Sequence, residues 1–378
     1  HQRLTLEVSF ETLLKSQRQE RNDLRTGVYI GIQTSEFSVF QKSNSSYAAT
    51  GSSLAIAANR VSYSLGLKGP SMAIDTACSS SIVALDTACK AINASDCEQA
   101  LVAGINVILT ENSYIVTSAA NMLSSNGRCA TFSSEADGYA RGEGCGVILL
   151  TSLSNIQKDD FVFGMIQSTA VNQDGKSANL TSPNGPSQEA VIKSAIERAG
   201  IDALDIDYIE AHGTGTPLGD PQEIQAIHNV FSAQHNKTLF VGAVKANIGH
   251  LEAAAGIAGL IKAVLCLQHK QIPANIHNDN INPRLLPFLE KSCIVFPQEV
   301  SEMNNRKELY AGVSSFGFGG TNSHAVISSV INYISPPQFN MKWDRRPFYW
   351  NDHNYHPLTG KLVSSKDNQH VWECQWTN

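Results

Sequence analysis

The sequence lacks several features that mark other classes of protein. No apolar run reaches the ~18 residues that a membrane-spanning helix needs. The formal net charge is −6, and no block of Lys and Arg interrupts the sequence. Proteins that bind nucleic acid through its phosphates carry clustered positive charge instead. We therefore expect no membrane span and no nucleic-acid site, and His1–Glu7 does not have the pattern of a signal peptide.

Cysteine is present, but its arrangement excludes two common uses. The eight cysteines form no CxxC pair and show no regular spacing, so they indicate neither a zinc site nor a disulfide framework. We expect a reducing, cytoplasmic compartment and no bound metal. Because the chain does not begin with Met, we interpret it as starting inside a larger protein, with any targeting segment upstream of His1.

Tryptophan is absent until late in the chain. All four tryptophans lie beyond Pro336-Pro337, where the composition also becomes rich in Pro and Asn. This change predicts one α/β body over residues 1–332 and a different segment, a linker, over residues 333–378. An alternative for the tail is a plain disordered segment.

In the body, short apolar runs alternate with amphipathic segments. The runs predict buried strands at Thr26–Ile32, Ala100–Ile108, Gly146–Leu150 and Asp207–Glu210. The amphipathic segments predict helices at Ser79–Ile92, Gln188–Ala199, Pro221–Phe231 and Ala253–Gln268, with Ala199-Gly200 as a helix C-cap. Strands that alternate with helices predict a layered α/β fold with a largely parallel sheet.

Cys78 is the candidate nucleophile. It lies in Pro70–Ile82 (PSMAIDTACSSSI), where an apolar strand leads into a serine-rich helix start. A thiol at a strand-to-helix junction lies beside the positive end of the helix dipole, which favours the reactive thiolate. The competing interpretation is a buried, inert thiol, and we keep it for the remaining cysteines: Cys89, Cys97, Cys129, Cys145, Cys266, Cys293 and Cys374.

Two histidines lie in polar segments rich in small residues. His212 is in Glu210–Glu223 (EAHGTGTPLGDPQE), and His250 is in Lys245–Gly256 (KANIGHLEAAAG). Glycines let a ligand approach the backbone, and threonine hydroxyls can bond to an amide-bearing ligand. A single histidine at a helix start is more often a cap or a core residue. Two of them together with an isolated thiol instead indicate a nucleophile with helpers.

A third glycine-rich segment, Ser314–His324 (SSFGFGGTNSH), lacks the GK[ST] ending of a phosphate-binding loop. We expect a loop with one exposed aromatic, Phe318, whose backbone N–H could serve as an oxyanion donor. Gly138–Gly146 (GYARGEGCG) matches no dinucleotide fingerprint, and we interpret it as a turn packed against a strand.

Five motifs in this order resemble the ketosynthase domain of polyketide synthases. They are DTACSSS around Cys78, ADGYARGEG at Ala136–Gly144, EAHGTGTPLGDP at Glu210–Pro221, KANIGHLEAAAG at Lys245–Gly256 and GFGGTNSH at Gly317–His324. The resemblance extends from about His1 to about Ile327. It implies a thiolase fold, with two pseudo-duplicated halves in five αβαβα layers, and a homodimer.

The resemblance also implies an acyltransferase reaction and the residues that perform it. Cys78 would hold an acyl chain as a thioester, while His212 and His250 bind the carbonyl of a malonyl unit carried on an acyl carrier protein. Loss of CO₂ gives an enolate, which attacks the acyl group. The N–H groups of Cys78 and Phe318 would form the oxyanion hole. Lys245 and Glu252 resemble the supporting charged pair, and the residues expected to contact the carrier's phosphopantetheine are Thr214, Thr216, Asn247 and Phe318.

The resemblance implies no cofactor bound to the chain itself, because the carrier protein supplies the phosphopantetheine. Two departures bear on the substrate tunnel: Ala246 stands where the family usually has serine, and Ala178-Asn179 stands where it often has Asn-Gly. The first sixty or so residues of the family domain, which include a central strand, are missing, so we expect a fragment of a longer protein.

The tail carries a weaker resemblance. Arg345–Trp350 (RRPFYW) resembles the linker that follows condensing or acyltransferase domains. His356–Gly360 (HPLTG) and Val371–Glu373 resemble the start of a dehydratase domain. A ketosynthase that leads to a dehydratase without an acyltransferase between them implies that a separate, trans-acting acyltransferase loads the malonyl units.

Three other interpretations remain. A non-elongating ketosynthase, which transfers an acyl chain without condensing it, typically lacks one motif histidine, whereas His212 and His250 are both present. A fatty-acid or polyunsaturated fatty-acid condensing enzyme shares the fold, although DTACSSS and the GEGCG region favour the polyketide type. A cysteine hydrolase would need a His–Asn or His–Asp pair, which nothing in the sequence selects.

Overall fold

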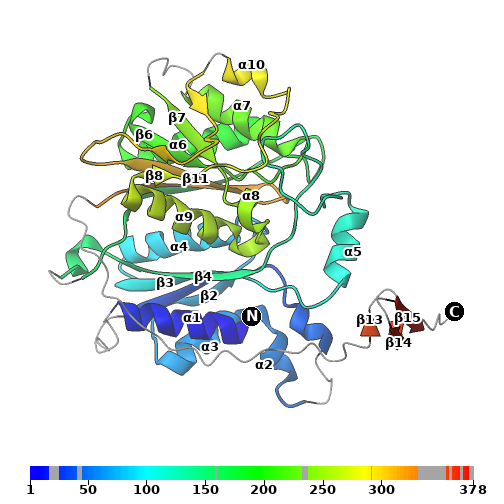
Figure 1. Cartoon of the computed structure of the whole chain (residues 1–378). Helices are drawn as coiled ribbons and strands as arrows, with labels where there is room; N and C mark the ends of the chain where they lie inside the picture. The colour runs from blue at the N-terminus through cyan, green and yellow to red at the C-terminus, as the bar shows by residue number, and fades with distance from the viewer. Residues whose placement is uncertain are drawn as a thin grey trace.

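Two mixed β-sheets stack on either side of a shared layer of helices in the computed structural model (Figure 1). The structure describes residues 1–16, 25–40, 45–157, 160–231, 237–290 and 292–330. It describes residues 355–356, 360–366 and 369–373 by their backbone. From one outer face to the other, the layers are helices, sheet, helices, sheet and helices, which confirms the five-layered architecture.

The first sheet has the strand order β2-β1-β3-β4. Its strands are β1 (Thr26–Gly31), β2 (Ser71–Ile74), β3 (Gln99–Asn106) and β4 (Gly144–Thr151). β1 runs parallel to β2 and β3, whereas β4 is antiparallel to β3. Every residue of β1 and β3 is buried, as expected for apolar strands covered on both faces. Their outer face packs against α1 (Gln2–Lys15) and α3 (Leu54–Leu65).

The second sheet has the order β5-β12-β11-β6-β7-β9. Its strands are β5 (Met165–Gln173), β6 (Ile206–Glu210), β7 (Leu239–Gly242), β9 (Ile294–Val295), β11 (Tyr310–Phe316) and β12 (Thr321–Ser328). The run from β11 to β9 is parallel, and β12 is antiparallel to both β11 and β5. Its outer helices are α6 (Gly185–Ala199) and α7 (Gly219–Phe231).

The two sheets repeat one topology. β2, β1, β3 and β4 correspond in order and direction to β7, β6, β11 and β12, so the two halves are duplicated as the resemblance implied. The expectation of a largely parallel sheet was incomplete, because each sheet contains one strand that runs against the others, β4 in the first and β12 in the second. The hairpin of β11 and β12 was not expected, because its glycine-rich sequence was interpreted only as a loop.

The central layer consists of α4 (Ser80–Asn93) and α9 (Ala255–His269). The Ser81 hydroxyl, at the start of α4, accepts a hydrogen bond from the Ile257 N–H at 2.9 Å. A Cβ at Gly256 would lie 2.5 Å from Ile82, so only glycine allows the two helices to approach this closely. The two halves therefore join at the N-terminal ends of their central helices.

The predicted helices and strands lie within a few residues of those observed. Gly200 has φ 67° and ends α6 as the predicted C-cap, and the Asn184 side chain caps its start by accepting from the Ser187 N–H. The shorter helices are α2 (Ala48–Ser52), α5 (Asn112–Ala119), α8 (Lys245–Ile248) and α10 (Leu286–Leu289). β8 (Gln271–Ile272) and β10 (Ser301–Glu302) form a separate antiparallel pair.

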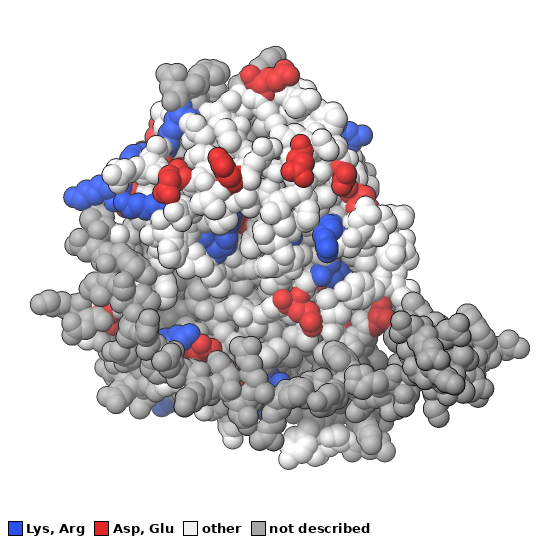
Figure 2. All heavy atoms as spheres, in the orientation of Figure 1, with Lys and Arg blue, Asp and Glu red and all other residues white. Residues whose placement is uncertain are grey.

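Beyond the body, β13 (Tyr355–His356), β14 (Gly360–Lys366) and β15 (Gln369–Glu373) form an antiparallel sheet. The expected linker motif Arg345–Trp350 lies outside the described residues. Among the helices that the structure describes, none is long and apolar enough to span a membrane. Acidic and basic side chains are scattered over the face shown in Figure 2 rather than gathered by sign.

Candidate active site

Cys78 lies in the turn between β2 and α4. Ala77, immediately before it, has φ 57°, a left-handed conformation that is strained for a residue with a Cβ. The serines that follow hold this turn: the Ser79 hydroxyl donates to the Thr76 carbonyl at 2.9 Å, and the Ser80 hydroxyl donates to the Ala77 carbonyl at 2.6 Å. The serine-rich helix start therefore fixes the position of the nucleophile as well as beginning α4.

His250 lies directly against the thiol. Its Nε2 is 3.0 Å from Cys78 Sγ. Its Nδ1 accepts a hydrogen bond from the Glu252 backbone N–H at 3.2 Å. Because Nδ1 is an acceptor, a neutral imidazole carries its proton on Nε2 and points that N–H at Sγ. His250 is thus arranged as a hydrogen-bond donor at the position where the reacting atoms would lie.

His212 approaches the same point from the end of β6. One ligand atom each of Cys78, His212 and His250 lie within 4.8 Å of one another. The two imidazole rings meet edge to face, with their centroids 5.4 Å apart. The convergence of these three side chains, which sequence spacing alone did not establish, is present in the fold.

Two buried carboxylates on α7 hold the glycine-rich turn that carries His212. Glu223 accepts from the backbone N–H groups of His212 at 2.6 Å and Gly213 at 2.8 Å. Asp220 accepts from the Gly215 N–H at 3.0 Å and from the Phe132 N–H at 2.8 Å. Burial raises the pKa of Asp220 to about 6 and that of Glu223 to about 7. Both residues are inside the motif quoted from the sequence, but we had assigned them no role.

The pKa of Cys78 is raised, whereas a position at a helix start was expected to lower it and favour the thiolate. Burial raises the pKa of Cys78 to about 12, and the Glu252 carboxylate adds to the rise. Lys245 and the N–H groups of Phe318 and Cys78 oppose it. The pKa values of His212 and His250 fall well below the usual range because both are buried and near the Lys245 ammonium. At neutral pH the site therefore holds a thiol and two neutral imidazoles.

The glycine loop between β11 and β12 brings main-chain donors to the sulfur. The backbone N–H groups of Phe318 and Cys78 lie close enough to Cys78 Sγ to act against the rise in the pKa of the thiol. A Cβ on Gly317 would lie 2.4 Å from the Thr76 carbonyl oxygen, so the close approach of the loop requires glycine there. The Phe318 side chain is 47% exposed, as the sequence predicted for the one aromatic of the loop.

One predicted pairing is wrong. We expected Lys245 and Glu252 to form a charged pair, but Glu252 binds Arg141 through two contacts, Nε–Oε1 at 2.7 Å and Nη2–Oε2 at 2.9 Å. Within the described part of the chain, no ion pair or hydrogen bond joins Lys245 to Glu252. Lys245 is buried, and burial lowers its pKa although the carboxylates of Glu210 and Glu223 act against this.

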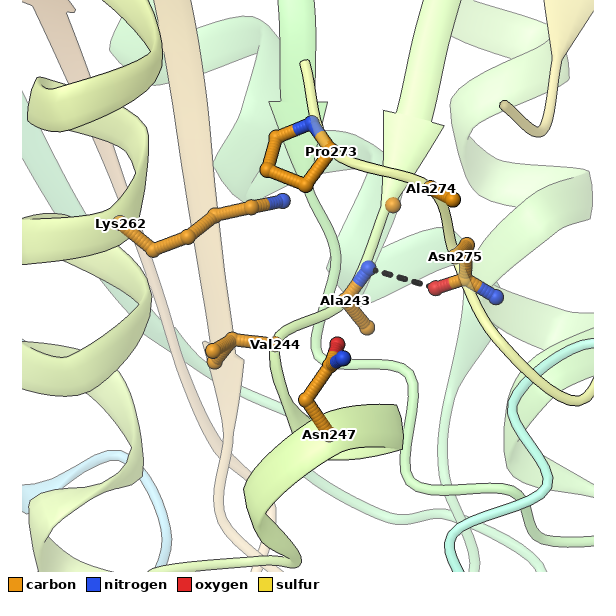
Figure 3. Close-up of a pocket in the computed structure, with 8 residues that line it drawn as sticks. Ala243, Val244, Asn247, Lys262, Pro273, Ala274 and Asn275 are labelled. Carbon is orange, nitrogen blue, oxygen red and sulfur yellow. Dashed lines mark hydrogen bonds between the residues drawn. The ribbon is translucent and has the colours of Figure 1, made fainter. Parts of the chain in front are cut away.

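The residues expected to contact phosphopantetheine fall into two groups. The Thr214 and Thr216 hydroxyls lie 3.3 Å apart in the turn after His212. Asn247 instead projects into a cavity of about 230 Å³ beside α8 (Figure 3). Cys78, His212 and His250 do not line this cavity; its lining is Gly242, Ala243, Val244, Asn247, Lys262, Pro273, Ala274 and Asn275.

Comparison with known proteins identifies the group that shares this arrangement. Family models for the N-terminal and C-terminal domains of β-ketoacyl synthase match residues 1–155 and 163–279. The chain belongs to the β-ketoacyl synthase family. These condensing enzymes are acyltransferases, and its relatives place this ketosynthase domain among those of polyketide synthases, in a thiolase fold.

A phenolphthiocerol/phthiocerol polyketide synthase of Mycobacterium tuberculosis is 44% identical over 86% of this chain. The cyclo-acetoacetyl-L-tryptophan synthase of Aspergillus oryzae is 38% identical, and its match covers the whole chain. The ketosynthase from module 6 of the Bacillus subtilis bacillaene synthase superposes with a TM-score of 0.81 at 37% identity, covering 87% of this chain and 59% of that one. This chain spans only 18% of the mycobacterial relative and 10% of the Aspergillus one.

Proposed function

We propose that this ketosynthase domain catalyses decarboxylative Claisen condensation with Cys78 as the nucleophile. The observation that carries the proposal is the convergence of Cys78 Sγ with two imidazoles. The N–H groups of Phe318 and Cys78 lie near enough to affect the pKa of the thiol. A nucleophile surrounded by donors suits a reaction in which negative charge develops twice on oxygen. The family membership of the chain supports the same reaction.

In the first step, Cys78 attacks an acyl thioester. The new S–C bond forms as the carrier's thiol leaves, and the thiol proton of Cys78 passes to the departing sulfur. The N–H groups of Cys78 and Phe318, which lie near enough to the sulfur to affect the pKa of the thiol, would bind the carbonyl oxygen as it becomes an oxyanion. Because burial keeps the pKa of Cys78 high, we expect the thiolate to form only as the acyl thioester binds.

In the second step, a malonyl thioester loses CO₂ and its electron pair becomes an enolate. The Nε2–H of His250 and an N–H of His212 would donate to the enolate oxygen. The enolate carbon attacks the acyl carbonyl, and the C–S bond to Cys78 breaks with its electron pair going to Sγ. The sulfur takes up a proton from water, and a β-ketoacyl thioester remains on the carrier. Two neutral imidazoles suit this role because each offers an N–H hydrogen-bond donor without carrying a full charge in the resting site.

We propose an acyl carrier protein as the partner, with its phosphopantetheine arm bound near Thr214, Thr216 and Phe318. The exposure of the Phe318 side chain supports a role at the entrance. Asn247 lies outside the reacting cluster, so a contact of this residue with the phosphopantetheine has less support.

We also propose a homodimer, a trans-acting acyltransferase and domain boundaries at residues 1–332 and 333–378. The seven described cysteines are free, which fits a cytoplasmic protein.

The test is intact-protein mass spectrometry with an acyl carrier protein thioester, followed by malonyl carrier protein. Cys78→Ala should abolish the acyl adduct. His250→Ala should keep the adduct but block its conversion to the β-ketoacyl product. Condensation retained by the His250 variant would refute the assigned roles, and an adduct that moves unchanged to the carrier would indicate a transfer module instead.

A further inference from the structure

Arg141 is a buried cation that the proposed reaction does not use. Its side chain is 3% exposed and lies between two carboxylates, those of Glu252 and Glu36. It also donates to the Ser113 hydroxyl and lies over the Tyr114 ring, 4.8 Å from the centroid. A guanidinium held on so many sides has one orientation, which makes it a suitable anchor for a neighbouring group.

The backbone around Arg141 is paired with His250. The His250 N–H donates to the Ala140 carbonyl at 2.7 Å, and the Gly142 N–H donates to the His250 carbonyl at 2.8 Å. A Cβ on Gly142 would lie 2.6 Å from the Ile248 carbonyl oxygen, so this pairing requires glycine. The segment that we interpreted as a turn packed against a strand therefore also holds the main chain of His250.

Glu252 connects Arg141 to the imidazole ring. Its backbone has φ 47°, a left-handed conformation that costs free energy for glutamate. In this conformation its N–H donates to His250 Nδ1 at 3.2 Å. Its carboxylate is held at the same time by the two contacts from Arg141, at 2.7 and 2.9 Å. One residue thus bears both a strained backbone and a buried, two-point ion pair.

We infer that Arg141 is a positioning residue for His250. Its pair with Glu252 keeps the Glu252 backbone in the left-handed conformation, and the Glu252 N–H then keeps His250 in the tautomer with its proton on Nε2, facing Cys78. The inference rests on the proposed function, since the Nε2–H matters only if it donates to the enolate. Without the ion pair, the Glu252 N–H would no longer hold the proton of His250 on Nε2. The Glu252 carboxylate would also be left unpaired near the thiol.

The test compares three variants of the full chain: Arg141→Gln, Arg141→Gln/Glu252→Gly and the control Arg306→Gln. Arg306 makes an ion pair with the buried Asp207 at 2.7 Å in the other half of the body, although its own side chain is 37% exposed. Two rates are measured for each variant, the acylation of Cys78 and the decarboxylation of malonyl carrier protein. Nitrogen-15 NMR of labelled histidine reports the tautomer of His250, whose signals are identified by their absence in His250→Ala.

We expect Arg141→Gln to lower decarboxylation by ~10- to 100-fold, the range observed when a partner that orients a metal-binding histidine is removed, while acylation changes far less. The Nδ1 and Nε2 signals of His250 should move towards a mixture of tautomers. The double variant should recover part of the lost decarboxylation rate. Glycine at position 252 adopts the left-handed conformation without help from an ion pair, and the unpaired carboxylate is gone. The control should match the wild type in both rates.

Equal losses of acylation and decarboxylation with an unchanged His250 tautomer would overturn the inference, since a merely structural role predicts that result. If Arg141→Gln does not fold, Arg141→Lys keeps the charge but loses the two-point contact, and the same comparison of rates and tautomer decides. Decarboxylation that survives His250→Ala would instead refute the proposed function and would be seen before any Arg141 variant is made.

Discussion

Replacing Gly317 with alanine should separate the glycine loop from the nucleophile turn. The added Cβ would lie 2.4 Å from the Thr76 carbonyl oxygen and 3.1 Å from the Ser79 hydroxyl, whereas ordinary contact begins at 3.4 Å. The nearer atom belongs to the backbone of a turn held by several hydrogen bonds, so the loop has to move by about the size of the overlap. A displacement of that size moves the Phe318 N–H away from the nucleophile turn, and with it one of the two proposed oxyanion donors.

The expected magnitude follows from the loss of one main-chain donor. Removing one donor from an oxyanion hole costs ~10²- to 10³-fold in kcat, or about 2.7–4 kcal/mol. Acylation of Cys78 and the carbon–carbon bond-forming step should both fall by this order, since both pass through an oxyanion on the acyl carbonyl. Decarboxylation of malonyl carrier protein, which depends on the histidines, should fall much less.

Gly319→Ala is the matched control within the same loop. A Cβ at Gly319 would meet nothing within 4 Å, so this variant should acylate at close to the wild-type rate. The assay is single-turnover acylation followed by mass spectrometry, with circular dichroism to confirm folding. A Gly317→Ala enzyme that acylates as fast as the Gly319→Ala enzyme would refute the assignment of the Phe318 N–H.

Three further predictions concern charge and packing. Because burial raises the pKa of Cys78 to about 12, the rate at which iodoacetamide alkylates Cys78 should rise ~tenfold per pH unit from pH 7 to 10. A rate that levels off near pH 8 would contradict this high pKa. Burial raises the pKa of Glu223 to about 7, so the native state binds more protons than the unfolded state between pH ~4.5 and 7. Stability measured by urea unfolding should fall as pH rises through that window, and less so in Glu223→Gln. Ser81→Ala leaves the buried Ile257 N–H without its acceptor and should cost about 1–3 kcal/mol of unfolding free energy, whereas an unchanged urea midpoint would show that this contact does not join the halves.

The sequence predicted the elements that carry periodic or apolar signals. The strands around Val28 and Leu101 and the helices beginning near Ser80 and Ala255 follow directly from such patterns. The hairpin of β11 and β12 was not predicted, because the glycines of Gly317–Gly320 led us to interpret the whole segment as a loop and to miss the strands on either side. Its direction relative to β5 is set by contacts with residues more than a hundred positions away, which periodicity does not report.

The reacting side chains were predicted through their motifs, but their supports were not. Arg141, Asp220 and Glu223 all lie inside segments that we quoted, and charged residues beside glycines are usually interpreted as a solvated turn. Only the fold shows that these side chains are buried, the two carboxylates against backbone N–H groups and Arg141 against the carboxylates of Glu252 and Glu36. The Lys245–Glu252 pairing failed for the same reason, because proximity in sequence did not give proximity of the charged atoms.

The contacts that assemble the site span long stretches of chain. Cys78 and His250 are 172 positions apart, and Arg141 and Glu252 are 111 apart. Neither half of the body contains the whole constellation, since the first half supplies the thiol and the second supplies both imidazoles. Contacts of such long range form late, after the entropy of closing large loops has been overcome. Recovery of catalysis during refolding should therefore follow the docking of the two halves, so that activity reports the completed tertiary structure and not the folding of either half.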